Sequence, residues 1–230
     1  MMKDIATEIL EKGWYWTEYQ PIVDIQEHVY AYEALARFYY NGLVVQPDKL
    51  FGSIRDDVQF FYEFECAVKK EQFKNRPKNL PLFLNLDLHT FQYRQGINNL
   101  ILRFARHHDF IIELVGNSLD VVNAGRLTEV FQKTNFKYAI DGYFKDHNPF
   151  SLKLFFGSSV IKLDKGILQH LKTQPDFAYV IDGVIRYAHA NHKMTLLAGI
   201  ETTQDEEIAR NLGVDWMQGF LFKSKTIYAK

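Results

Sequence analysis

Polar side chains stand near the ends of successive apolar runs along this chain. They are carboxylates, amides and one amine: Glu33, Asn85, Asp87, Glu113, Asp141, Lys162, Asp164, Glu201 and Gln218. Carboxylate and amide oxygens, with no thiol among them, are the ligands that hard divalent cations such as Mg²⁺ and Mn²⁺ prefer. A lysine beside them suits a phosphate group or a metal-bound water. The pattern favours a divalent metal site, and a solvated acidic rim is the alternative.

The elements that must position these side chains are short apolar runs separated by longer amphipathic stretches. Helical spacing of apolar residues occurs in 59–73, 118–134, 176–192 and 204–213, and the last of these ends at a glycine cap. The first two runs are joined by only three residues, which predicts an antiparallel hairpin, and after them the two kinds of pattern alternate regularly. The strand-like runs are 19–25, 29–38, 82–88, 110–115, 138–143, 159–164, 194–200 and 216–222.

This alternation predicts an α/β fold, a (β/α)₈ barrel of the TIM type with an irregular, antiparallel first strand pair. An open, doubly wound sheet is the runner-up. We expect one domain over residues 1–230, because no Pro-, Gly- or Ser-rich linker interrupts the pattern. A barrel gathers the carboxyl ends of its strands at one mouth, so the polar side chains are expected to converge there.

Composition narrows the class of partner. The formal net charge is −1, which argues against a nucleic-acid polymer as partner. The lone cysteine, Cys66, fits a reducing compartment. The first 16 residues have the pattern of a short amphipathic helix with charges throughout, and no apolar run approaches 18 residues. We therefore expect a soluble, cytoplasmic protein without a membrane partner.

Seven segments, in order, resemble those of the EAL domain family, the cyclic di-GMP phosphodiesterase fold of bacteria. They are YQPIVDIQEHVYAYEALARF, LFLNLD, IIELVGNS, YAIDGY, VIKLD, LLAGIET and GVDWMQGFLF. The resemblance covers nearly the whole chain and includes the Glu33-Ala34-Leu35 signature. It implies a barrel whose first two strands are antiparallel, in agreement with the hairpin predicted above.

The resemblance also implies roles for individual residues. The ligands of a first metal would be Glu33, Asn85, Glu113 and Asp141. Lys162 matches the lysine that contacts the hydrolytic water or the phosphate, and Gln218 matches the glutamine of the last strand. The positions that hold the nucleotide would be Gln20, Leu35, Arg37 and Lys162, with Glu63 where many members have an aspartate that meets a guanine.

Three positions depart from the family pattern. Gly142 and Ala198 stand where the family has acids of the second metal site, and Gly116 stands where it has a glutamate that braces the metal loop and the dimer. These departures imply one residual Mg²⁺ or Mn²⁺ site and the loss of the second. Glu201 lies beyond the glycine turn and does not replace the missing acid, whereas Asp146 or His147 is an alternative source of a ligand.

The expected function is therefore that of a degenerate EAL domain in cyclic di-GMP signalling. It would act as a catalytically impaired nucleotide receptor or as a protein-interaction module, with cyclic di-GMP, an unidentified protein and a second copy of the chain as expected partners. An active, metal-dependent phosphodiesterase that produces the linear dinucleotide pGpG is the alternative. A third reading, an unrelated barrel enzyme, stays open at this point.

Overall fold

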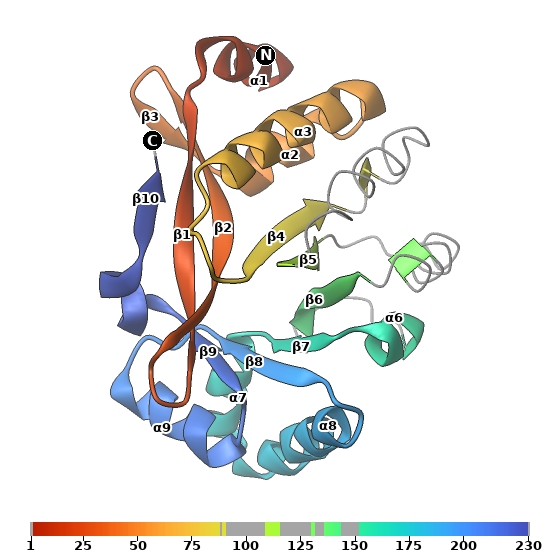
Figure 1. The fold of residues 1–230 in the computed structure, drawn as a ribbon, viewed down its shortest axis with the longest axis vertical. Helices are drawn as coiled ribbons and strands as arrows, with labels where there is room; N and C mark the ends of the chain where they lie inside the picture. Colours follow the sequence, from red (N-terminus) through yellow and green to blue (C-terminus); the bar gives the residue numbers. More distant parts are fainter. Residues whose placement is uncertain are drawn as a thin grey trace.

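A closed barrel forms the centre of the molecule (Figure 1). The computed structural model describes residues 2–87, 89–90, 109–115, 130–131, 136–143 and 152–229. Around the barrel the strand order is β1-β9-β8-β7-β6-β5-β4-β2, and β2 pairs back with β1. The strands are β1 (Tyr15–Asp24), β2 (Val29–Tyr40), β4 (Leu82–Asp87), β5 (Phe110–Val115), β6 (Lys137–Tyr143), β7 (Val160–Leu163), β8 (Met194–Ala198) and β9 (Trp216–Gln218). The closure confirms the predicted barrel and excludes the open sheet.

The strand directions are those of the predicted irregular barrel. β2 and the strands from β4 to β9 run parallel to one another, whereas β1 is antiparallel to both β2 and β9. β1 and β2 are longer than the other strands and continue as a hairpin beyond the barrel (Figure 1). Two short strands that the sequence pattern did not predict, β3 (Leu43–Val45) and β10 (Ile227–Ala229), pair antiparallel with the extensions of β2 and β1.

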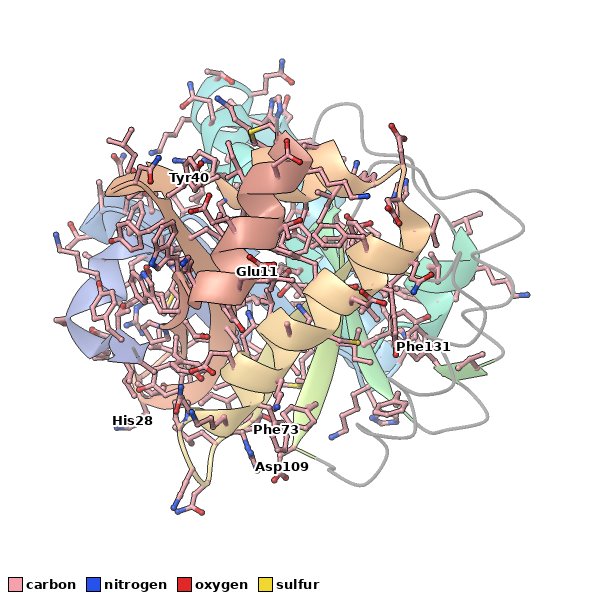
Figure 2. The ribbon with its side chains drawn as sticks, turned by 90° about the horizontal axis from the view of Figure 1, so that it is seen from above. Glu11, His28, Tyr40, Phe73, Asp109 and Phe131 are labelled. Carbon is pink, nitrogen blue, oxygen red and sulfur yellow. The ribbon has the colours of Figure 1, made fainter. Side chains whose placement is uncertain are left out.

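Helices cover the barrel and the hairpin extension. In Figure 2, α1, which carries Glu11, and α3, which carries Phe73, lie over the strands, and Phe73 lies beside Asp109, the residue before β5. The Phe73 and Phe110 rings are 5.3 Å apart, which ties the end of α3 to the start of β5. The helices are α1 (Met2–Lys12), α2 (Pro47–Ile54), α3 (Val58–Lys74), α6 (Leu152–Gly157), α7 (Gly166–Thr173), α8 (Ala178–Ala190) and α9 (Thr203–Leu212).

Alternation along the strands creates two apolar layers. One face of each strand packs against the helices, as Leu82, Leu84 and Leu86 do in β4. The other face fills the barrel, with a cluster made by Ile22, Ala31, Phe83, Ile111, Ala139, Val160, Leu196 and Trp216. A third cluster, around Phe38 and Phe64, lies between the hairpin extension and α1, α2 and α3.

Two expectations need correction or lie outside what is described. The run 216–222 is a strand only at Trp216–Gln218 and continues as a 3₁₀ helix, Phe220–Lys225. The strand ends at Gly219, where the chain passes so close to Ile200 that a Cβ would lie 2.0 Å from the Ile200 carbonyl oxygen. The expected helix 118–134 lies outside the described residues except for 130–131. Among the helices that are described, none is long and apolar enough to cross a membrane.

Candidate functional site

The barrel interior changes from apolar to polar between one inward-facing residue of a strand and the next. Two positions after an interior apolar residue stands a polar one on the same face, as in Phe83 and Asn85 of β4 or Val160 and Lys162 of β7. Because the strands from β4 to β9 are parallel, these second positions fall at one end of the barrel. The polar set there consists of Glu33, Asn85, Glu113, Asp141, Lys162 and Gln218, and these side chains are brought together as the sequence predicts.

Lys162 is the centre of this set. Its Nζ atom lies 3.0 Å from Glu33 Oε2 and 3.6 Å from Asp141 Oδ1, and it also donates to Glu113 Oε1. Lys162, Glu33 and Glu113 are buried, whereas 42% of the Asp141 side chain is exposed. Three carboxylates around one ammonium leave the cluster with a formal charge of −2 when all are ionised.

Amide side chains hold the Glu33 carboxylate from two sides. Asn85 Nδ2 donates to Glu33 Oε1 at 2.7 Å, and Gln218 Nε2 donates to Glu33 Oε2 at 2.7 Å. Gln218 Nε2 also lies 3.0 Å from Gln20 Oε1, which links β1 to the same network. Strands from opposite ends of the chain thus fix one carboxylate.

Burial and charge act differently on the three titratable groups. Burial raises the pKa of Glu33, but Lys162, Gln218 and Asn85 outweigh it, so the Glu33 pKa lies below its ordinary value. Burial and the neighbouring Glu33 and Asp141 charges raise the pKa of Glu113 well above its usual range, against the pull of Lys162. Burial disfavours the charged form of Lys162, yet the three acids together hold the Lys162 pKa well above its usual value. Lys162 therefore stays charged, and of the two buried carboxyl groups Glu113 is the one whose charged form is disfavoured.

The donor set suits a hard divalent cation chemically. It offers carboxylate oxygens and an amide oxygen, and its formal charge of −2 would balance the charge of one divalent ion. Glu113 Oε2 is buried with no hydrogen-bond partner among the residues described. In the structure the carboxylates surround the Lys162 ammonium instead of a metal ion. Within the described ranges, no three Asp, Glu, His or Cys side chains have the arrangement of a metal site.

Two cavities open on either side of this cluster, and Glu33 and Asp141 line both. The smaller has a volume of about 260 Å³ and is also lined by Lys162, Ala198 and Phe220. The larger, of about 610 Å³, lies between β2, α2, α3 and the ends of β4, β5 and β6. Glu33 and Asp141 thus form the wall that the two cavities share.

The expected nucleotide positions fall unequally on these cavities. Gln20 lines the smaller cavity, and Leu35 and Arg37 line the larger. The Arg37 guanidinium is engaged on one side, because its Nε donates to Glu18 Oε2 at 2.9 Å and its Nη1 to the Ala36 carbonyl oxygen. Glu63 is exposed on α3, accepts a hydrogen bond from Gln59 and lines neither cavity, so the structure does not bring it to the site.

A model of the family described as "EAL domain" matches residues 3–225. The chain belongs to the EAL domain family. At 24% identity over 232 residues it resembles "Probable cyclic di-GMP phosphodiesterase PdeN" of Escherichia coli (strain K12), and the alignment covers 95% of this chain but only 44% of that protein.

Solved structures with similar folds include other EAL domains. One is an EAL domain protein from Listeria monocytogenes EGD-e, with a TM-score of 0.78 and 18% identity, over 96% of this chain and 92% of that one. Another is the Bacillus subtilis YkuI protein in complex with substrate c-di-GMP and calcium, with a TM-score of 0.76 and 20% identity, over 97% of this chain and 58% of that one. At these identities the likeness establishes a shared fold.

This EAL domain has no acid at two of the positions noted above. Ala198, at the end of β8, pairs with Gln218 and places a methyl group beside the smaller cavity. Gly142 has a φ of 75°, a region that side-chain-bearing residues seldom adopt, and the β6–β7 register shifts there. Glu201 is exposed on the rim of the smaller cavity. Gly116, Asp146 and His147 lie outside the described residues.

Sequence reasoning missed three polar residues of α3 that line the larger cavity. Glu65, Lys69 and Gln72 are buried on the same helix face as Phe61 and Val68. Their spacing of four and then three residues placed them on that apolar face from the start, and this was the available signal. Arg55 and Asp87 also line the larger cavity of this EAL domain and are joined by an ion pair of 2.8 Å.

Proposed function

We propose that this EAL domain is a cyclic di-GMP receptor with impaired hydrolytic activity. The observation that carries the proposal is the combination at the barrel mouth of a methyl group, Ala198, where an acid is expected, with two adjoining cavities lined by cationic and amide side chains. Binding needs complementary charge and shape, whereas hydrolysis also needs a positioned and activated water.

The cavities suit the parts of a cyclic dinucleotide. Such a ligand carries two phosphates and two flat bases, so it is elongated and anionic. Arg37 Nη2 donates no hydrogen bond to a described residue, which leaves this group for a phosphate oxygen. Lys165 lines the smaller cavity as an exposed second cation. The solved YkuI protein, which shares the fold, binds c-di-GMP. These features support nucleotide binding in which the contacts of Lys162 with Glu33, Glu113 and Asp141 stay as they are.

Impaired hydrolysis follows from the acids that are missing. Glu33, Asn85, Glu113 and Asp141 would hold one Mg²⁺ or Mn²⁺ ion, which when bound supplies a Lewis acid and an activated water. Gln218 and Asn85 orient Glu33, and Lys162 offsets one of the three carboxylate charges. Loss of a positioned acid or base typically lowers a rate by about 10²–10⁴. The lack of an acid at both Ala198 and Gly142 is therefore expected to leave binding intact and turnover negligible.

Calorimetry with a chelator present tests the receptor function. We expect wild-type protein to bind cyclic di-GMP, and Arg37→Ala to weaken binding by about 10- to 100-fold, the range for a hydrogen bond to a charged group. Arg186→Ala is the matched control, because Arg186 also forms a 2.9 Å ion pair but lies exposed on α8. If folded wild-type protein gives no heat at high micromolar ligand, the receptor proposal fails and a protein-interaction module, acting with another protein or a second copy, replaces it.

Hydrolysis to pGpG is the second candidate, favoured by one specific observation. All four expected ligands of the first metal are brought to one mouth together with Lys162. Chromatography of cyclic di-GMP incubated with the protein and Mg²⁺ or Mn²⁺ separates the two functions. Turnover of about 1 s⁻¹ or more, within the ordinary range for enzymes, would establish the phosphodiesterase.

A further inference from the structure

The larger cavity fills a gap along one edge of β2. On that side β2 pairs with β4 through Tyr32–Ala34 and with β3 through Phe38–Tyr40. Between these two pairings, residues 35–37 have no strand beside this edge in the part of the chain that is described, and they pair with β1 on the opposite edge. The volume of about 610 Å³ lies within the usual range of small-molecule sites. Phe51, Val68 and Leu35 supply apolar wall.

Two buried side chains of α3 line this cavity with incomplete hydrogen bonding. Lys69 is 5% exposed, and its nearest ionic partner, Glu65 Oε1, is 3.9 Å away. Glu65 already accepts hydrogen bonds from the Asp87 backbone N–H and from Thr90 Oγ1. Lys69 therefore retains a donor for another acceptor.

Gln72 has the opposite deficit. It is 1% exposed, and its Nε2 donates to the Ala34 carbonyl oxygen at 2.9 Å. Its Oε1 has no hydrogen-bond partner within the described residues. Buried polar atoms in proteins are nearly always paired, so an unpaired acceptor beside an underused donor indicates a ligand with the complementary pattern. Residues three apart on a helix lie on one face, about 5–6 Å apart at Cβ, which places both groups against the same ligand edge.

We propose that Lys69 and Gln72 read the polar edge of a guanine base in the larger cavity. Lys69 donates to the guanine O6 acceptor, and Gln72 Oε1 accepts from the 2-amino group. This assignment rests on the proposed function, since guanine is the base of cyclic di-GMP. Adenine presents an amino donor where guanine has O6 and would set donor against donor at Lys69.

Changing the base of the ligand tests the assignment without altering the protein. Calorimetry would compare cyclic di-GMP with cyclic di-AMP, which exchanges O6 for an amino group, and with cyclic di-IMP, which lacks only the 2-amino group. Wild-type protein is expected to bind cyclic di-AMP about 100-fold and cyclic di-IMP about 10-fold more weakly than cyclic di-GMP. Equal binding of cyclic di-GMP and cyclic di-AMP would overturn the assignment of Lys69. Equal binding of cyclic di-GMP and cyclic di-IMP would overturn that of Gln72.

Substitution of the two side chains completes the test. Lys69→Met should weaken cyclic di-GMP binding by about 10- to 100-fold, because it removes the donor to the guanine base. Binding of cyclic di-AMP should stay nearly unchanged, because adenine does not accept this hydrogen bond. Lys70→Met, at the exposed neighbouring position, is the control and should bind as wild type does. Gln72→Met should abolish the difference between cyclic di-GMP and cyclic di-IMP.

The failures of the two proposals are distinguishable. Absence of binding by the wild type refutes the receptor function and this assignment together. Wild-type binding that is unchanged in Lys69→Met, with melting curves that show folded protein, refutes this assignment alone.

Discussion

Replacing Lys162 with methionine should destabilise the fold strongly. The substitution keeps the length and much of the apolar volume of the side chain but removes the charge that Glu33, Glu113 and Asp141 share. Glu33 retains its hydrogen bonds from Asn85 and Gln218, whereas Glu113, which is fully buried, loses its only hydrogen-bond donor among the described residues. Removal of one partner of a buried ion pair costs about 3–5 kcal/mol.

The assay is thermal unfolding followed by circular dichroism in a chelating buffer. For a chain of this size, each kcal/mol shifts the Tm by about 2–4 °C, so Lys162→Met should melt about 6–20 °C below wild type at pH 7.5. Lys172→Met is the matched control, because its ion pair with Asp205 is also short, at 2.8 Å, but the lysine is 37% exposed. Surface pairs are worth about 0–1 kcal/mol, so this control should melt within about 4 °C of wild type.

The pH dependence gives the same prediction a second readout. Burial already raises the pKa of Glu113, and loss of Lys162 raises it further. A carboxyl whose folded pKa exceeds its unfolded pKa stabilises the fold below the unfolded value, about 4.3, and loses this contribution as the pH rises through the folded value. The deficit of Lys162→Met should therefore shrink at pH 5. A Tm equal to that of Lys172→Met, or a deficit independent of pH, would refute the electrostatic description of the cluster.

Three further predictions follow from other parts of the structure. Burial raises the pKa of Glu65 to about 7, so stability should fall as the pH rises from about 4.5 to 7, and Glu65→Gln should flatten this part of the stability profile measured by urea unfolding. Glu18→Gln removes the ion pair of the Arg37 guanidinium and should tighten cyclic di-GMP binding a few-fold in calorimetry. Weaker binding would show instead that the ion pair holds the arginine in the orientation that the ligand needs. Gly199→Ala should cost about 1–3 kcal/mol because of its φ of 83°, whereas Gly183→Ala in α8 should stabilise by about 0.5–1 kcal/mol, and equal melting temperatures would contradict this.

The barrel was predictable because its strands obey simple patterns. Runs such as 110–115 are apolar except for Glu113, a pattern typical of strands buried on both faces, and the structure places β5 at the same residues. The N-terminal amphipathic helix and the helix that ends at Gly213 are also confirmed, the latter with Gly213 in the left-handed conformation. β3 and β10 escaped prediction because three residues are too few to show a period.

The convergence of the polar residues was predictable for a related reason. In a parallel barrel, the last residues of neighbouring strands must meet, so Asn85, Glu113 and Lys162 could be placed together from their strands alone. What the sequence did not predict is how the side chains neutralise one another. The Lys162 contacts with Glu33 and Glu113, and the pairing of Arg37 with Glu18, depend on side-chain directions across strands that are far apart in the chain.

The polar lining of the larger cavity was not predicted from the sequence. Glu65, Lys69 and Gln72 interrupt the apolar face of α3, and a polar residue on such a face reads equally well as a surface position when the helix boundaries and rotation are unknown. Glu63, which the resemblance to the family suggested as the guanine contact, precedes Glu65 by two positions on α3 and faces solvent. A shift of two residues on a helix rotates the side chain by about 200°, which suffices to exchange the buried face for the exposed one.

The most direct test recovers the ligand after it has been bound. Cyclic di-GMP is incubated for hours with an excess of the protein and Mn²⁺, protein-bound ligand is separated by filtration, and the bound fraction is released and chromatographed. A receptor with impaired hydrolysis should retain the ligand on the protein and return it as unchanged cyclic di-GMP. Conversion to pGpG within seconds to minutes, or ligand that passes the filter freely while the protein remains folded, would contradict it.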